Sequence, residues 1–329
     1  MSSMAIPCYR ASDIRRAITM TEMIGVMRSA FIAISSGDAV VPPRSRIDVG
    51  PTDGVALFMP SYLPASEALG VKTVTLFRNN PDLGLPTIHG LMLLFDGATG
   101  GPMAILEGDS LTALRTGAAS GVATDLLARP DAHVVAVIGT GPQAEAQLRA
   151  VCAVRRITRA LVSGRDGAKS ARFALRMSDA LGIEVAAVDT HAAVRHADIV
   201  CTATSSREPL FVHGTVAPGT HLNAIGSYKP DRQEIPGETV AGSVLFVDSL
   251  EAALLEAGDL IIPLEERLIS RDSIRGEIGQ LLQGSVKGRT EPRELTLFKS
   301  VGNALQDLTA AVEIHSRLRE DATIQRITL

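Results

Sequence analysis

The sequence has few cysteines and no excess of basic residues. Cys8, Cys152 and Cys201 are odd in number and far apart, which argues against a disulfide framework and against a zinc ribbon. The seven histidines are equally dispersed, so we expect no bound metal. The sequence contains 32 basic and 36 acidic residues, so we expect neither nucleic acid nor a membrane surface as a partner.

Long apolar runs are also missing. The runs at 91–95 and 134–138 are far shorter than the roughly 20 residues that a membrane-spanning helix needs. The first 20 residues contain three scattered arginines and no apolar segment followed by a cleavage site, so no signal peptide is predicted. We therefore expect a soluble protein of the reducing cytoplasm. A length of 329 residues with 46% hydrophobic residues suffices for two domain cores.

Short β-rich runs recur between residues 132 and 249, and segments of helical composition separate the first few of them. This alternation predicts an α/β fold with a doubly wound parallel sheet, a Rossmann domain. The expected strands are 134–139, 160–163, 184–189, 199–204, 221–226 and 244–248.

The N-terminal third has a different pattern, which predicts a mixed α+β domain. A helical stretch at 20–34 ends before a glycine, and extended segments broken by proline and glycine follow it. An alanine-rich helix at 111–127 could bridge the domains, and a last helix at 301–318 could return to the N-terminal domain. The extended segments are 44–49, 55–60, 71–77 and 91–95.

A glycine-rich turn follows the first strand of the parallel array. Gly139 and Gly141 would supply the tight turn and the close backbone approach, and Ala144 would let the next helix pack closely on the sheet. The helix N-terminus would offer N–H groups to a pyrophosphate. Taken alone, this turn could also join a strand to a helix with nothing bound. The predicted cofactor-binding residues are Gly139, Thr140, Gly141, Pro142, Gln143 and Ala144.

The end of the second strand bears on the choice of cofactor. NAD-selective sites usually place an acid there to bind the ribose hydroxyls, whereas this sequence has Ser163 and Arg165, which suit a 2′-phosphate. We therefore expect a preference for NADP(H), with NAD(H) possible. Alternatively, Arg165 merely starts a solvated helix that Asp166 caps.

Six segments, in order along nearly the whole chain, carry a resemblance to the ornithine cyclodeaminase and mu-crystallin family. Several ungapped motifs in sequence are far more specific than a glycine turn. The segments are 42–44 (PPR), 70–72 (GVK), 111–120 (LTALRTGAAS), 139–144 (GTGPQA), 223–227 (NAIGS) and 297–308 (LFKSVGNALQDL).

The resemblance implies a homodimer built from two domains per chain. Residues 1–112 and 307–329 would form the substrate-binding and dimerisation domain, and residues 113–306 the dinucleotide-binding Rossmann domain. It further implies that Arg44, Lys72 and Arg115 hold a substrate carboxylate, that Thr116 approaches the nicotinamide, and that Lys299 contacts the cofactor. Arginine's planar fork suits a carboxylate.

Each of these residues also has an ordinary structural interpretation. Arg44 could be a surface residue after a Pro-Pro turn, and Arg46 lies only two positions away. Lys72 could be a strand-edge charge, and Arg115 could form a salt bridge within its helix. Lys299 could form an interdomain ion pair or cap a helix, and Asp307 of the same motif could do the same. His89, between two apolar runs, is more often a structural residue and is not included among the catalytic candidates.

The residue at position 228 bears on the reaction. Cyclodeaminases of this family carry a catalytic aspartate in a Gly-Gly-Asp-x-Pro segment, and the matching residue here is Tyr228. The resemblance therefore favours the ketimine reductases, which reduce Δ1-pyrroline-2-carboxylate or Δ1-piperideine-2-carboxylate to proline or pipecolate. Lys72 would orient the imine or assist proton delivery. Tyr228 could line the substrate site or be an ordinary loop aromatic.

Three other activities fit the same sequence. An alanine or other amino-acid dehydrogenase uses the same hydride geometry on an open-chain imine. An ornithine cyclodeaminase would have to work without the usual aspartate. A non-catalytic, mu-crystallin-like protein would bind NADPH or a hormone, although Lys72 and Arg115 argue for catalysis.

Overall fold

The computed structural model describes residues 5–328 and divides the chain into two compact units. Unit 1 comprises Met1–Arg115 with Asn303–Leu329, and unit 2 comprises Thr116–Gly302. The sequence places these boundaries at 112/113 and 306/307. Helix α3 (Gly108–Leu127) runs through the first boundary, so its first two turns belong to unit 1 and the rest to unit 2.

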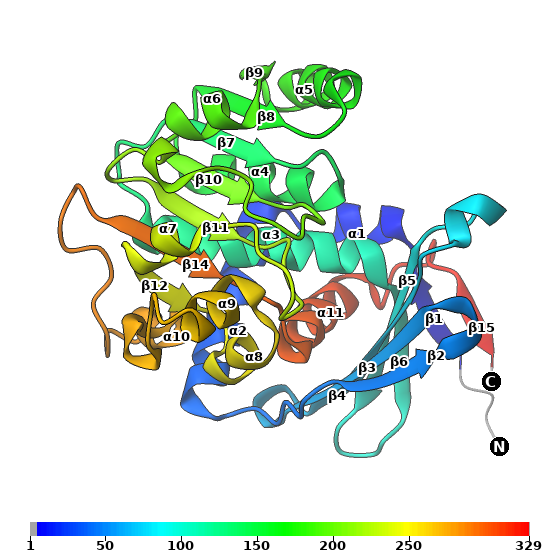
Figure 1. Cartoon of the computed structure of the whole chain (residues 1–329). Helices are drawn as coiled ribbons and strands as arrows, with labels where there is room; N and C mark the ends of the chain where they lie inside the picture. Colours follow the sequence, from blue (N-terminus) through cyan, green and yellow to red (C-terminus); the bar gives the residue numbers. More distant parts are fainter. Residues whose placement is uncertain (1–4, 329) are drawn as a thin grey trace. The chain divides into compact units, whose positions relative to one another are not determined.

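Unit 1 is built on a seven-stranded mixed sheet (Figure 1). The four extended segments expected from the sequence are β2–β5, which form an antiparallel meander with β6. Strand β1 is parallel to β6 and antiparallel to β15, so both ends of the chain join one edge. In sheet order the strands are β15 (Arg326–Thr328), β1 (Ala5–Tyr9), β6 (Pro102–Glu107), β5 (Ile88–Asp96), β4 (Ala68–Phe77), β3 (Gly54–Leu63) and β2 (Ser45–Val49).

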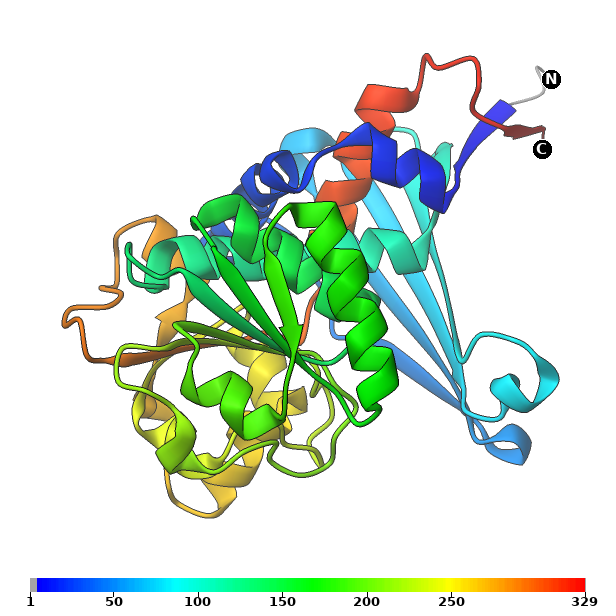
Figure 2. The ribbon, with the colours of Figure 1, turned by 90° about the horizontal axis from the view of Figure 1, so that it is seen from above.

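One face of this sheet is covered by α11 (Ala304–Leu318), whose N-cap is Asn303. Figure 2 shows α11 in red against the long blue and cyan strands. Helix α2 (Met20–Ser36) packs on α11 and begins with a capping box between Thr19 and Glu22. The other helical segments of unit 1 are α1 (Ala11–Ala17), η1 (Gly50–Thr52), η2 (Pro64–Ser66) and η3 (Asn80–Leu83).

Within residues 5–328, no single helix is long and apolar enough to cross a membrane. Only α1 and α2 taken together pass on length and composition, and the chain bends by 87° between them. The buried residues of α2 belong to the core of unit 1.

Unit 2 contains an eight-stranded sheet in which all pairings are parallel. From β9 to β14 its strand order is the 3-2-1-4-5-6 order of the dinucleotide-binding fold, so the predicted Rossmann sheet is confirmed. The sequence did not predict β13 and β14. In sheet order the strands are β9 (Glu184–Ala187), β8 (Arg159–Ser163), β7 (Val134–Ile138), β10 (Ile199–Thr202), β11 (His221–Ala224), β14 (Leu295–Lys299), β12 (Ser243–Val247) and β13 (Ile274–Glu277).

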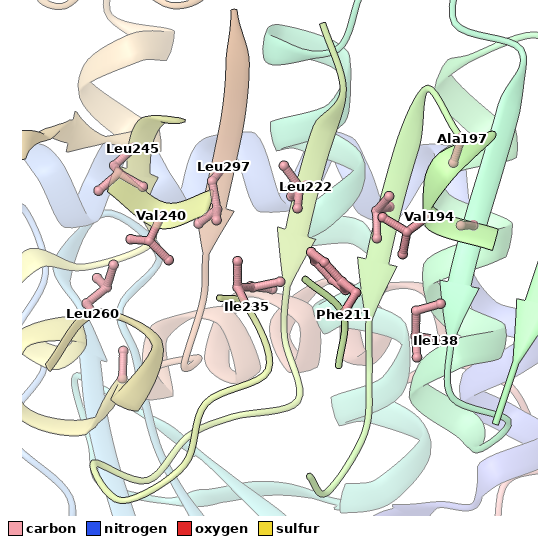
Figure 3. Close-up of a cluster of buried hydrophobic side chains, with 14 of the residues drawn as sticks. Ile138, Val194, Ala197, Phe211, Leu222, Ile235, Val240, Leu245, Leu260 and Leu297 are labelled. Atoms are coloured by element: carbon pink, nitrogen blue, oxygen red, sulfur yellow. The ribbon is translucent and has the colours of Figure 1, made fainter. Parts of the chain in front are cut away.

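Alternate residues of these strands enter two separate cores, one on each face of the sheet. Ala136 and Ile138 of β7 point into one core, and Val135 and Val137 into the other. This explains why the strands read as continuous apolar runs. Figure 3 shows the first core, in which Phe211 and Ile235 fill the space beside Leu222.

Helices and short turns connect the strands of unit 2. Helices α4 and α5 contribute to the second core, and α6 to the first. The connecting elements are α4 (Pro142–Val154), α5 (Gly167–Leu181), α6 (Thr190–Arg195), η4 (His213–Thr215), α7 (Gly237–Ala241), α8 (Leu250–Glu256), α9 (Gly258–Glu265), η5 (Arg271–Ser273) and α10 (Ile278–Leu282).

Candidate functional site

The turn between β7 and α4 has the geometry that a dinucleotide requires. Gly139 adopts φ 129°, and a Cβ added there would lie 2.4 Å from the carbonyl oxygen of Ala203. Gly141 is the N-cap of α4, and a Cβ there would meet no described atom within 4 Å. Gly139 is therefore required by the backbone conformation and by the close packing against Ala203, whereas Gly141 leaves open space at the N-terminus of α4.

The N-terminus of α4 is available for an anion. No side chain caps it within the described chain, Pro142 occupies its first turn, and Ala144 is fully buried against the sheet. The N–H groups of Gln143 and Ala144 lie in the first turn, where a helix has no carbonyl partner for them. These residues, with Thr140, fit a pyrophosphate as the motif predicts.

The end of β8 holds the two residues expected to select the cofactor. Ser163 is buried, and its Oγ lies 2.8 Å from Thr190 Oγ1. Arg165 is exposed. Asp166 does cap α5, because its Oδ1 accepts from the N–H of Lys169 at 3.0 Å. The capping interpretation is thus correct for Asp166, and it leaves the guanidinium of Arg165 at the surface of unit 2.

A buried cluster of charged groups lies in unit 1, where β4, α3 and α11 meet. Lys72 Nζ donates to Asp307 Oδ1 at 2.8 Å and to Thr112 Oγ1 at 2.5 Å. Arg115 donates through Nε to the same Asp307 oxygen at 3.0 Å, and through a terminal nitrogen to Gln306 Oε1 at 2.8 Å. The side chains of Lys72 and Arg115 are only 3% and 7% exposed, and that of Asp307 is fully buried. Two residues predicted to bind the substrate, Lys72 and Arg115, thus both bond the carboxylate of Asp307.

The cluster combines three basic side chains, Arg44, Lys72 and Arg115, with the single carboxylate of Asp307. Burial lowers the pKa of Lys72 to about 8; the charge of Asp307 opposes this change, while Arg115 and Arg44 reinforce it. Burial alone would raise the pKa of Asp307, but Arg115 and Lys72 hold it below its usual value. At the start of α3, partial desolvation and the charge of Glu107 raise the pKa of Asp109, while the charge of Lys72 opposes this change. A cluster of this kind attracts a carboxylate.

The structure distinguishes Arg44 from its neighbour Arg46. Arg44 is partly buried, and its charge acts on Lys72. Arg46 is exposed and bonds Asp48 through Nε at 3.0 Å. The ordinary surface interpretation therefore applies to Arg46, and Arg44 belongs with Lys72.

The loop after β11, residues 226–228, is held by a buried network in unit 2. Glu234 accepts from the N–H groups of Gly226 at 2.8 Å and Ser227 at 3.2 Å. Lys299 Nζ donates to Ser227 O at 2.5 Å and to Asp259 at 2.7 Å. Lys299 is fully buried, so its ammonium positions this loop and does not reach the surface of unit 2. Tyr228, next in the loop, is 38% exposed.

Two further predicted residues are located as follows. The carbonyl of Thr116, the first residue of unit 2, accepts from the side chain of Gln147 at 3.4 Å. His89 pairs with Thr75 across β4 and β5, whereas Lys72 pairs with Met92. Because side chains alternate along a strand, His89 lies on the sheet face opposite Lys72.

Sequence reasoning missed the acids that organise both clusters. For Asp307 the sequence suggests only a helix cap or an interdomain ion pair, yet its carboxylate joins Lys72 to Arg115 within unit 1. Its signal was available, since two polar residues, Gln306 and Asp307, interrupt the buried face of α11. Glu234 and Asp259 had no such signal, because their partners lie far away in the sequence.

The fold and the glycine turn of unit 2 define a protein of the dinucleotide-binding class, and unit 1 adds a buried cluster of charged side chains. Residues 8–322 match the sequence model of the ornithine cyclodeaminase/mu-crystallin family, and the chain belongs to that family. The resemblance stated from the motifs is confirmed.

Three similar proteins cover almost the whole chain. A Δ1-pyrroline-2-carboxylate reductase from Bacillus cereus is 38% identical over 319 residues, 96% of this chain and 98% of the relative. The Δ1-pyrroline-2-carboxylate reductase of Thermococcus litoralis, solved with NADH and L-proline, is 42% identical with a TM-score of 0.94, covering 98% of this chain and 100% of the other. An archaeal alanine dehydrogenase, solved as a dimer with bound NAD, is 30% identical with a TM-score of 0.92, covering 98% and 99%.

Proposed function

We propose that the protein is a nicotinamide-dependent reductase of cyclic ketimine carboxylates. It reduces the C=N bond of Δ1-pyrroline-2-carboxylate or Δ1-piperideine-2-carboxylate and forms proline or pipecolate. The observation that carries this proposal is the buried pair Lys72 and Arg115 on one carboxylate, in a chain 38% identical to a pyrroline-2-carboxylate reductase.

Arg115, with Arg44, anchors the substrate carboxylate in this proposal. Arg115 already has a planar donor group held by Asp307 and Gln306, so little side-chain entropy is lost when a carboxylate binds. Arg44 adds a second positive charge near Lys72. Together they fix the ring so that its imine carbon is presented in one orientation.

Lys72 supplies the proton that the reduction consumes. The nicotinamide, when bound, supplies the hydride. With a pKa of about 8, the Lys72 ammonium is a stronger acid than an ordinary lysine, so it can protonate a ring amine of ordinary basicity. Solvent then restores the ammonium. Thr112 and Asp307 hold Nζ in place throughout.

Tyr228 supports a reductase over an ornithine cyclodeaminase. It occupies the sequence position of the cyclodeaminase aspartate and offers a phenol there in place of a carboxylate. Without that carboxylate, ammonia loss and ring closure lack their acid–base group. We therefore expect the protein to reduce cyclic ketimines and not to deaminate ornithine.

An alanine dehydrogenase is the second candidate, favoured by the 30% identical archaeal enzyme. A panel assay separates the two. We expect NAD(P)H oxidation with Δ1-pyrroline-2-carboxylate or Δ1-piperideine-2-carboxylate, little with pyruvate plus ammonia, and no ammonia release from ornithine. Faster turnover with pyruvate plus ammonia would favour the dehydrogenase, and ammonia from ornithine would contradict the argument from Tyr228. Binding of NADPH without turnover of any substrate would favour a binding protein.

The same assay, run with both cofactors, tests the proposed preference for NADP(H). The exposed Arg165 supports this preference, because a 2′-phosphate would gain a charge-assisted bond there. Ser163 can add a hydroxyl bond once it turns from Thr190. NAD(H) remains usable, since nothing at the turn itself depends on the phosphate.

Replacing Arg165 with alanine is expected to raise the Kd of NADPH by about tenfold, roughly the effect of one solvent-exposed charge-assisted bond, and to leave that of NADH unchanged. Fluorescence titration measures both constants. Arg176→Ala, on helix α5 that follows Arg165, is the matched control, because Arg176 already pairs with Glu145. Equal effects of Arg165→Ala on both cofactors would contradict the assignment.

A homodimer is supported by the uncovered face of the unit 1 sheet. Ile47, Leu69 and Leu91, on β2, β4 and β5, are 55%, 39% and 52% exposed. The strand pairings place all three on the same face of the sheet, opposite α11. Exposed apolar side chains gathered on one face of a sheet are typical of a subunit interface. Light scattering should give the mass of two chains, and a monomeric mass would exclude this interface.

A further inference from the structure

Asp307 uses only one of its two carboxylate oxygens. Both Lys72 and Arg115 donate to Oδ1. The other oxygen, Oδ2, is buried and has no hydrogen-bond partner among the described residues. Buried carboxylate oxygens are almost always paired, so an unpaired one beside a proposed substrate site indicates a donor that arrives with the ligand.

The proposed substrate brings such a donor. The substrate carboxylate can bond the cations of the cluster. The ring nitrogen, however, carries one N–H in the substrate iminium and two in the product ammonium. These groups require an acceptor. Lys72 and Arg115 can only donate, so they cannot meet the requirement.

Thr112 and Gln306, the other side-chain acceptors that bond Lys72 or Arg115, are already in use. Thr112 Oγ1 accepts from Lys72 and donates to the carbonyl of Gly108 at 2.6 Å. Gln306 Oε1 accepts from Arg115. Among these described side chains, Asp307 Oδ2 is therefore the acceptor that has no donor.

We propose that Asp307 Oδ2 binds the protonated ring nitrogen, as the iminium N–H of the substrate and as the ammonium of the product. This inference rests on the proposed function and names the group that recognises the ring nitrogen. The carboxylate thus does two things: Oδ1 holds the cations that bind the substrate carboxylate, and Oδ2 selects the charged form of the imine. The negative charge of Asp307 offsets the repulsion between the cations of the cluster and the positively charged ring of the substrate.

Two ligands that differ at one ring atom test this assignment. Proline has a ring ammonium, whereas tetrahydrofuran-2-carboxylate has a ring oxygen, which can only accept. We expect the protein, saturated with oxidised cofactor, to bind proline at least about tenfold more tightly in calorimetry, since one charge-assisted bond is at stake. Equal affinities of the unmodified protein would overturn the proposal without any variant.

Asp307→Asn should reverse this preference. Lys72 and Arg115 require an acceptor, so the amide oxygen turns to them and the amide nitrogen takes the place of Oδ2. That nitrogen repels the ring ammonium and donates to a ring oxygen. The ratio of the two Kd values should therefore fall by tenfold or more. Glu313→Gln, on the same helix and paired with Arg317, is the control and should leave the ratio unchanged.

The readout separates this proposal from the proposed function. An unchanged ratio in a folded Asp307→Asn protein would overturn the role of Oδ2, even if the enzyme reduces cyclic ketimines. Conversely, absence of ketimine reduction by the unmodified protein would overturn the proposed function, while the binding ratio would still report whether Oδ2 faces a ring N–H.

Discussion

Replacing Lys72 with methionine is expected to lower kcat/KM for the ketimine by about 10²- to 10⁴-fold, the usual contribution of a positioned proton donor. Methionine preserves most of the side-chain volume on β4 but removes the ammonium that bonds Asp307 and Thr112. Steady-state kinetics with each cofactor measures the loss. The Kd of NAD(P)H should change little, because Lys72 belongs to unit 1 and the glycine turn to unit 2.

The pH profile gives the same prediction a second readout. The ammonium form of Lys72 predominates below its pKa of about 8. We therefore expect kcat/KM to fall as pH rises through about 8, with a basic limb that Lys72→Met lacks. Lys287→Met, at an exposed position, is the matched control and should keep both rate and limb. Unchanged turnover in Lys72→Met would remove Lys72 from the mechanism.

Replacing Gly141 with alanine is expected to weaken cofactor binding while the fold stays intact. The backbone at Gly141 has φ −92°, which any residue adopts, and the new methyl group would meet no described atom. The same methyl group would occupy the approach of the pyrophosphate to α4. We expect the Kd of NAD(P)H to rise on the order of tenfold or more in a fluorescence titration, equivalent to about 1.4 kcal/mol per factor of ten.

Gly139→Ala provides the contrast for this experiment. It requires a left-handed backbone, with φ 129°, and brings a Cβ to 2.4 Å from Ala203 O, so it should lower Tm as well as cofactor affinity. If Gly141→Ala lowered Tm as much as Gly139→Ala, its effect would be structural. If it left the cofactor Kd unchanged, the turn would not hold the pyrophosphate.

Six of the eight strands of the parallel sheet could be predicted from the sequence because each of them carries its own signal, whereas β13 and β14 were not predicted. Residues 134–138, for example, are apolar throughout, since both faces of the sheet are buried. Strands β1 and β15 carry no such signal: each is short, and they pair with each other from opposite ends of the chain. Their strand character depends on a partner that local sequence does not contain.

The candidate site shows the same division between local and distant information. The motifs around Lys72 and Arg115 indicated a carboxylate site through the family resemblance, but not what holds these cations together. That depends on Asp307, which is 235 residues from Lys72 and 192 from Arg115. Only the return of α11 to the unit 1 sheet brings Asp307 to them. Likewise, the burial of Lys299 follows from Asp259, which no sequence pattern connects to it.

The network around residues 226–227 bears on how new activities can arise in such a protein. Glu234 and Lys299 bond the backbone of Gly226 and Ser227, and Ser227 Oγ donates to the carbonyl of Arg232. None of these bonds involves the side chain of Tyr228. The frame of the loop is therefore independent of the residue it presents at position 228. A single codon change there can exchange a phenol for a carboxylate without removing any of these hydrogen bonds. Under the proposed function, this is the position at which evolution, or an engineer, would alter the reaction while the frame of the loop stays the same.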